Sequence, residues 1–260
     1  MKYLIVSGCS FTTDIDFRST EYPDMDTSWP KWPQLLAEKL NMKCINLARS
    51  GMGNEYIYST LHDQILNIPN KDEIGLVIAA WSQCQRSDYQ KITPWLKNPN
   101  NITASWVPTI LDTQGDVLYW VRRSLRYFLA FENMCERYNI PYLQTQMLGL
   151  FNDYLEGRIF GQDSYEFPTE EAIHGKSEVL ARFRREKQEI LEILMKYDEI
   201  LNTSKFIGWP NAHDLATLPL NHMVFGLENY KHEPWTISKS DLHPNADGHK
   251  KIAEYIYDTM

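Results

Sequence analysis

The stretch IGLVIAAW, residues 74–81, is the most strand-like run in the chain. Apolar residues occupy both alternating sets of positions along it, and its isoleucines and Val77 favour extended backbone. A strand with two apolar faces must be covered on both sides, which is typical of a central strand in a parallel sheet. This run therefore predicts an α/β protein with helices on both faces of its sheet.

On either side of this strand, short apolar runs alternate with longer amphipathic segments. Apolar runs that predict strands occupy residues 3–6, 43–48, 140–145 and 205–209. Segments with helical spacing cover about residues 32–40, 51–66, 117–138 and 178–201, and a last helix begins near Asn245. Because such strands are joined by right-handed crossovers, the sequence predicts a flavodoxin-like three-layer α/β/α sandwich with a central parallel sheet.

Two stretches, of about residues 87–116 and 150–177, interrupt this alternation. They lack periodicity, and the first carries Pro94, Pro99 and Pro108. Both are expected to be cap-like insertions near the active site. No Gly/Ser-rich linker or charge block divides the 260 residues, and one domain spanning residues 1–260 is expected.

Composition disfavours several classes of partner. Lys and Arg number 26 against 34 Asp and Glu, so the formal charge of −8 argues against a nucleic-acid backbone as the main partner. The four cysteines are widely spaced and fit neither a disulfide framework nor a zinc pattern. They are typical of buried thiols in a reducing compartment.

The opening stretch VSGCSFT, residues 6–12, has three readings: a lipoprotein cleavage site, a phosphate-binding turn or the location of a nucleophile. The first fails because only Tyr3 to Val6 form an apolar run after Lys2, whereas a signal peptide needs roughly 7–15 apolar residues. No later segment approaches the ~18 consecutive apolar residues of a membrane span. We therefore expect a cytoplasmic protein that does not interact with membranes.

Polar motifs follow three of the predicted strands: GCS at residues 8–10, GMGN at 51–54 and WSQ at 81–83. They should converge, because ligands of open α/β sheets bind at the carboxyl ends of the strands. The lysine and glycine spacing of a P-loop are missing, which favours the nucleophile. A serine nucleophile needs a base, and His243, with Asp241 close by, precedes the last helix.

These blocks resemble the signature of the SGNH hydrolases, also called GDSL-type esterases. The resemblance rests on Gly8-x-Ser10, on Asn46 followed by Gly51, and on HPNADGH at residues 243–249, in this order along the chain. It implies that Ser10 is the nucleophile and His243 the general base. It also implies that the backbone N–H groups of Ser10 and Gly51 stabilise the oxyanion.

Two departures from that pattern concern the oxyanion hole and the acid. Where the family has an asparagine as third donor, this chain has Ser82 and Gln83, one of which would have to substitute. The family's acid lies three residues before the histidine, a position occupied here by Ser240, whereas Asp241 lies two before. The site is therefore expected to be either a Ser-His-Asp triad or a Ser-His dyad.

Substrate contacts are expected from residues near the second and third blocks. Asn54 either begins a helix or points into the site. Trp81 belongs to the WSQ motif that follows the third strand. Arg86 is expected at the rim of the site, where it is either solvated or binds an anionic group. Trp95 and Trp106 either anchor the first insertion or form a wall over the site.

The sequence thus predicts a serine-dependent esterase that needs no metal or organic cofactor. The expected substrate is a short ester, such as an O-acetyl group on a carbohydrate or another small polar molecule. One alternative is a catalytically silent binding protein of the same fold. The other is an acyl or phosphoryl transferase acting on a nucleotide-like or carbohydrate substrate. Nothing in the sequence indicates the oligomeric state.

Overall fold

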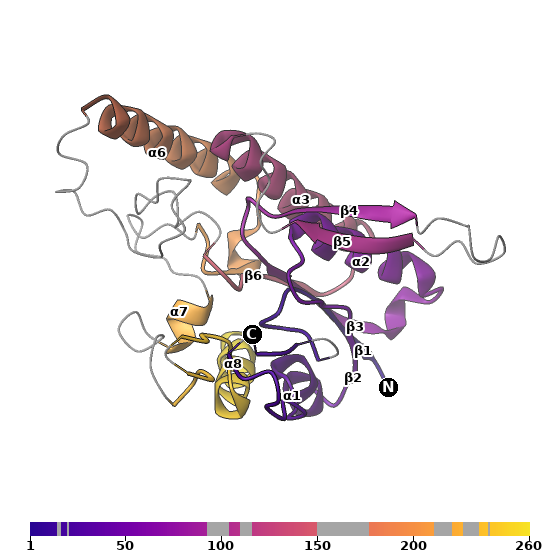
Figure 1. Cartoon of the computed structure of the whole chain (residues 1–260). Helices are drawn as coiled ribbons and strands as arrows, with labels where there is room; N and C mark the ends of the chain where they lie inside the picture. Colours follow the sequence, from indigo (N-terminus) through magenta and orange to yellow (C-terminus); the bar gives the residue numbers. More distant parts are fainter. Residues whose placement is uncertain are drawn as a thin grey trace.

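Five parallel strands form the central sheet of the computed structural model (Figure 1). With the labels of Figure 1, they are β1 (Tyr3–Ser7), β2 (Lys43–Asn46), β3 (Ile74–Trp81), β6 (Tyr142–Gln146) and β7 (Phe206–Ile207). Their order in the sheet is β2-β1-β3-β6-β7, with β3 in the middle as its two apolar faces predict. This is the flavodoxin-like order, and the predicted fold class is confirmed.

The structure describes residues 1–14, 17–19, 21–92, 104–109, 116–149, 177–210, 220–225, 234–238 and 240–260. Its helices are α1 (Trp32–Lys39), α2 (Asn54–Asn67), α3 (Val117–Arg137), α6 (Ser177–Asp198), α7 (Leu220–Phe225) and α8 (Ala246–Thr259), with 3₁₀ turns η1 (Lys71–Glu73) and η2 (Thr203–Lys205). Within these residues, no helix combines the length and the apolar character needed to cross a membrane.

Helices cover both faces of the sheet, and β3 supplies side chains to each. Val77, Ala79 and Trp81 pack into the cluster that includes α2, α3 and α6. The alternate residues of β3, such as Ile78 and Ala80, pack into a second cluster that includes α1, α7 and α8. Figure 1 shows the same division, with α1 and α8 on one side of the sheet and α3 and α6 on the other.

The first insertion contains regular structure that its sequence does not reveal. Residues Ser87–Ile92 form β4 and Ala104–Thr109 form β5, an antiparallel pair that lies beside α2 in Figure 1. Polar residues interrupt both strands, which removes the apolar alternation by which a strand is recognised. The lack of periodicity in this stretch therefore did not mean a lack of strands. Residues 93–103, 110–115 and 150–176, and Trp95 with them, lie outside the described residues.

The loop before α8 has a backbone geometry that depends on the residues of the HPNADGH block. The side chain of Asn245 accepts hydrogen bonds from the backbone N–H groups of Asp247 and Gly248, both at 3.0 Å, and so caps the helix. Its amide nitrogen donates to the carbonyl of Thr236 at 3.0 Å. At Gly248 an added Cβ would lie 2.1 Å from the carbonyl oxygen of Trp235. The loop and the helix therefore fit together only with glycine at this position.

We predict that Gly248→Ala lowers the free energy of unfolding by about 1–3 kcal/mol, because the methyl group would force a backbone carbonyl to move. Alanine is otherwise the better helix former by about 1 kcal/mol, so this loss runs against propensity. Gly75→Ala is the matched control, since its Cβ would chiefly meet the flexible end of Met42. Urea denaturation of the variants measures both effects. Equal stability of the two variants would contradict the prediction.

Candidate active site

Ser10 lies in a tight turn directly after β1, at the carboxyl edge of the sheet. The backbone N–H groups of Thr12 and Thr13 both donate to the carbonyl of Cys9, at 2.9 and 3.1 Å. Gly8 permits this turn, because an added Cβ would lie 2.6 Å from the hydroxyl oxygen of Thr12. The first block of the sequence thus folds into a turn that presents the side chain at position 10.

The loop after β2 is held against this turn. The side chain of Asn46 donates to the carbonyl of Thr12 at 2.8 Å, and the N–H of Arg49 donates to the carbonyl of Gly8 at 3.2 Å. Gly51 follows with φ of 77°, a conformation that glycine adopts without the steric cost of a Cβ. The first two blocks of the sequence are therefore neighbours, as expected for the ends of adjacent parallel strands.

The imidazole of His243 packs against two phenylalanine rings. The ring centroids of Phe11 and Phe17 are 4.8 and 4.6 Å from that of His243, and 30% of the histidine side chain is exposed. The backbone carbonyl of His243 accepts a hydrogen bond from the N–H of Ile237 at 2.9 Å. The ring is thus fixed by packing and by its loop, while one edge remains open to solvent.

Ser10, His243 and Asp241 form one continuous set of hydrogen bonds. The Oγ of Ser10 is 2.9 Å from Nε2 of His243, and Nδ1 of His243 is 2.7 Å from Oδ1 of Asp241. A proton on Nδ1 satisfies both contacts, because Nδ1 then donates to the carboxylate while Nε2 accepts from the serine hydroxyl. This is the geometry of a nucleophile, a base and an orienting acid.

The carboxylate of Asp241 is buried, with 5% of the residue exposed. Burial alone would raise its pKa, but hydrogen bonds from the side chains of His243 and Ser19 and from the backbone N–H of His243 outweigh it and lower the pKa to about 2. Asp241 is therefore ionised at neutral pH, which suits a group that holds an imidazole in one orientation.

Ser240, at the position of the family's acid, takes no part in these contacts. Its hydroxyl donates to the carboxylate of Glu21, and its Oγ is 3.3 Å from that of Ser238. The one-residue shift of the acid therefore does not reduce the site to a dyad, since the side chain of Asp241 reaches the imidazole from its own position.

In the WSQ motif at residues 81–83, Ser82 is buried and Gln83 is half-buried. The Ser82 hydroxyl has no exposed surface and no hydrogen-bond partner among the described residues. Gln83 accepts at Oε1 from Nε of Arg86 at 3.3 Å. Because arginine can only donate, this contact assigns the oxygen of the Gln83 amide and leaves its NH₂ group facing elsewhere. Arg86 also donates to the carbonyl of Met52 at 3.2 Å, so it links the loops after β2 and β3.

Asn54 begins α2, which is one of its two expected roles, and both Asn54 and Trp81 are buried. The amide of Asn54 accepts from the N–H of Ser82 at 2.8 Å and donates to its carbonyl and to the hydroxyl of Ser124, both at 3.1 Å. The ring of Trp81 has no exposed surface and packs against Phe128 at 4.6 Å. Both side chains join α2, β3 and α3, and neither is accessible to a ligand.

His249, the second histidine of the last block, is also buried. Burial is the largest cause that lowers its pKa, to about 3, and nearby Lys31 and His243 add to the effect. Its Nδ1 accepts from the backbone N–H of Trp32 at 3.3 Å, which joins α8 to the start of α1. The described residues contain no group of three His, Cys, Asp or Glu side chains arranged to hold a metal ion.

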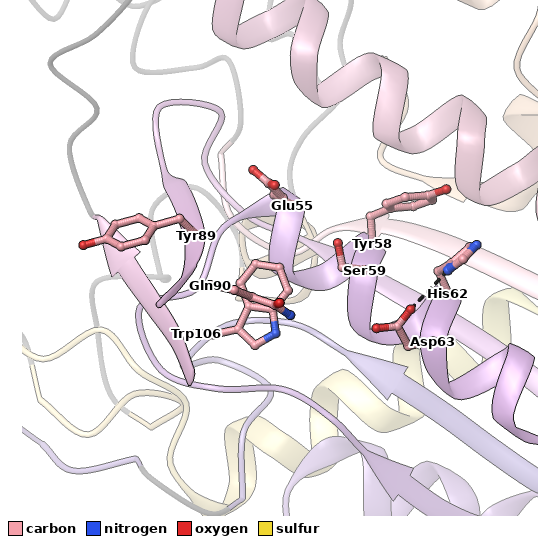
Figure 2. Close-up of a pocket in the computed structure, with 8 residues that line it drawn as sticks. All are labelled: Glu55, Tyr58, Ser59, His62, Asp63, Tyr89, Gln90 and Trp106. Atoms are coloured by element: carbon pink, nitrogen blue, oxygen red, sulfur yellow. Dashed lines mark hydrogen bonds and ion pairs between the residues drawn. The ribbon is translucent and has the colours of Figure 1, made fainter. Parts of the chain in front are cut away.

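A hollow of about 360 Å³ lies between α2 and the β4–β5 pair (Figure 2). Its lining comprises Glu55, Tyr58, Ser59, His62, Asp63, Tyr89, Gln90 and Trp106. None of Ser10, His243 and Asp241 lines this hollow.

The ring of Trp106 packs edge-on against that of Tyr56 in α2, with the ring centroids 5.3 Å apart. Trp106 thus anchors the hairpin to α2, which corrects the alternative of a wall over Ser10.

Solved structures similar to the whole chain include esterases and a protein of the G-D-S-L family. A protein assigned to the lipolytic G-D-S-L family from Desulfitobacterium hafniense DCB-2 is 14% identical, with 100% of both chains covered and a TM-score of 0.49. The psychrotrophic esterase EstA from Pseudoalteromonas sp. is 11% identical, with 100% of this chain and 96% of that chain covered and a TM-score of 0.49. The acetyl xylan esterase AlAXEase is 12% identical, with 99% of each chain covered and a TM-score of 0.41.

No protein-family model and no curated protein matches the sequence.

Sequence reasoning missed two residues at the site, Phe17 and Ser19. Phe17 packs on the ring of His243, and the hydroxyl of Ser19 donates to Oδ2 of Asp241 at 2.5 Å. Both lie in the long polar segment between β1 and α1, which has no periodicity and belongs to no signature block. No signal in the sequence associates them with a histidine more than 200 positions away.

Stability in acid tests the environment of Asp241. Its folded pKa of about 2 lies below the ~3.9 of an unfolded aspartate, so its carboxylate stabilises the fold above about pH 4. That contribution is lost as the pH falls from about 4 toward 2. The difference in unfolding free energy between wild type and Asp241→Asn should therefore shrink over this range, as measured by urea denaturation at successive pH values. A constant difference from pH 5 to pH 2.5 would contradict the shifted pKa.

Proposed function

We propose that this protein is a serine-dependent ester hydrolase with Ser10 as nucleophile, His243 as general base and Asp241 as the orienting acid. The observation that carries the proposal is the pair of contacts on either side of the imidazole, 2.9 Å to Ser10 and 2.7 Å to Asp241. Serine is a weak nucleophile unless a base takes its proton. The half-exposed Ser10 adjoins such a base.

In the proposed reaction, Ser10 Oγ attacks the ester carbonyl carbon while its proton passes to Nε2 of His243. The tetrahedral intermediate collapses, and the leaving alkoxide takes that proton and departs as an alcohol. Water then loses a proton to Nε2 and attacks the acyl-serine, which releases the acid and restores the serine hydroxyl. Asp241 stays ionised and stabilises the imidazolium formed in each half of the reaction.

The backbone N–H groups of Ser10 and Gly51 are the proposed oxyanion donors. Supporting this role, the loop that carries Gly51 is bonded to the Gly8 carbonyl through Arg49. We propose Gln83 as the third donor, because Arg86 occupies its carbonyl oxygen and leaves its NH₂ group available. The hydroxyl of Ser82 is a poorer candidate, since it has no exposed surface.

The alternative of a silent binding protein is disfavoured by the state of the acid. A site that had lost catalysis would not need Asp241 to be buried and bonded to His243, as it is here.

Transfer of the acyl group to an acceptor other than water would use the same acyl-serine. Identification of the reaction products distinguishes such transfer from hydrolysis. The proposed substrate is a short ester, such as an O-acetyl group on a carbohydrate, for which the net charge of −8 poses no repulsion, in contrast to a polyanion.

Reaction with a fluorophosphonate tests the nucleophile without knowledge of the substrate. We expect the probe to label the wild-type protein at Ser10, as mapped by mass spectrometry, because this serine has a base within hydrogen-bond reach. Ser10→Ala should abolish labelling at this site, and His243→Ala should lower its rate by at least ~10³-fold. Ser28→Ala, at an exposed serine of the segment before α1, is the matched control and should label normally.

A folded wild-type protein that the probe leaves unlabelled would overturn the proposed hydrolase. If labelling succeeds, a panel of acetyl, propionyl and butyryl esters of sugars and simple alcohols, with and without an added acceptor alcohol, distinguishes hydrolysis from transfer and measures the acyl length accepted.

Single substitutions at Gln83 and Ser82 identify the third oxyanion donor. We predict that Gln83→Ala lowers kcat by about 10²–10³-fold with little change in KM, because an oxyanion donor acts mainly in the transition state. Ser82→Ala tests the competing donor in the same assay. A large loss of kcat in Ser82→Ala, with none in Gln83→Ala, would reverse the assignment.

A further inference from the structure

The carboxylate of Asp241 is held at both oxygens, by different parts of the chain. Oδ1 accepts from Nδ1 of His243 at 2.7 Å and from the backbone N–H of His243 at 3.2 Å. Oδ2 accepts from the hydroxyl of Ser19 at 2.5 Å. Ser19 is 2% exposed and Asp241 is 5% exposed, so solvent does not compete for the contact between them.

The hydroxyl of Ser19 is itself oriented. Its oxygen accepts a hydrogen bond from the backbone N–H of Tyr22 at 3.0 Å. Because an N–H can only donate and an ionised carboxylate can only accept, the single proton of this hydroxyl is directed to Asp241. A continuous series of donors and acceptors therefore runs from Tyr22 through Ser19, Asp241 and His243 to Ser10.

The carboxylate of Asp241 could turn about its Cβ–Cγ bond if only one of its oxygens were held. Asp241 already accepts from the backbone N–H of His243, which is the local turn that aspartate side chains readily form. Rotation about the Cβ–Cγ bond would withdraw Oδ1 from the imidazole and from this N–H together. The bond from Ser19 to the other oxygen fixes the plane of the carboxylate and keeps Oδ1 directed at Nδ1.

The rest of the segment holds the same loop at neighbouring points. Glu21 accepts from the hydroxyls of Ser238 and Ser240, and Phe17 packs on the ring of His243 at 4.6 Å. The hydroxyl of Ser238 in turn accepts from the backbone N–H of Asp241 at 2.9 Å. Residues 17–19 and 21–22 therefore support the acid, the histidine ring and the loop between them.

We propose that Ser19 is a positioning residue of the active site, whose hydroxyl aligns Asp241 with His243 and so compensates for the one-residue shift of the acid. The inference rests on the proposed hydrolase, because alignment of the imidazole matters only if His243 acts as a base. Ser19 touches no reacting atom, so its effect is transmitted entirely through Asp241.

The first test is the second-order rate of fluorophosphonate labelling in Ser19→Ala and Ser19→Thr, with Ser28→Ala as the matched control. Ser19→Ala should label about 10- to 100-fold more slowly, because a hydrogen bond to a buried carboxylate is lost. Ser19→Thr keeps the hydroxyl and should recover the rate to within about threefold. Melting temperatures, measured alongside, separate misalignment from loss of structure.

The second test does not require activity. A carbon-13 NMR titration of aspartate-labelled protein, with Asp241→Asn used to assign the signal, reports the pKa of Asp241. Loss of the Ser19 donor disfavours the carboxylate form, so Ser19→Ala should titrate above the wild-type pKa of about 2. Ser19→Thr should titrate with the wild type.

The outcomes separate this inference from the function on which it rests. Failure of the wild type to label overturns the hydrolase, and an unchanged Asp241 titration in Ser19→Ala then overturns the contact as well. Wild-type labelling with an equal rate in Ser19→Ala overturns the positioning role alone. If Ser19→Ala labels slowly and is poorly folded, and Ser19→Thr does not restore the rate, then Ser19 serves the stability of the fold. That outcome also overturns the positioning role.

Discussion

The hydrogen bond between Ser10 and His243 joins the turn after the first strand to the loop before the last helix, 233 positions apart in the sequence. It can form only if the carboxyl end of β1 and the amino end of α8 meet at the same edge of the molecule. The parallel sheet ensures that all strand ends of one kind lie at that edge. The helices α1 and α8 then pack together on one face of the sheet, which brings the histidine loop over the serine turn.

Small residues and capping side chains define the backbone geometry around this contact. Gly8 and Gly248 each lie where a Cβ would collide with a neighbouring atom, and Asn46 and Asn245 each bond to backbone groups of the loops they join. Much of the signature that resembles an esterase family thus specifies loop geometry, and only a few of its residues are chemical groups. The same arrangement lets Asp241, one position away from the usual acid, reach His243.

The fold was largely predictable, since it follows from patterns that are local in the sequence. The apolar run of β3 and the spacing of α3 and α8 predict elements that the structure has at nearly the same bounds. The β4–β5 hairpin was not predictable, because its strands lack an apolar alternation. The sequence left Asn54 open between a helix start and a residue of the site, because the partners of its amide, the backbone of Ser82 and the hydroxyl of Ser124, are distant in the sequence.

By itself, the sequence determined the order of strands and helices and the residue types that gather at the strand ends, because periodicity and turn residues act over a few positions. It also singled out Ser10 and His243 as partners, through motifs at the two ends of the chain. Only the tertiary structure decided which acid contacts the histidine and which residues contact that acid. Ser19 and Asp241 are 222 positions apart, and a contact between such distant residues depends on the whole chain having folded, so no local pattern records it.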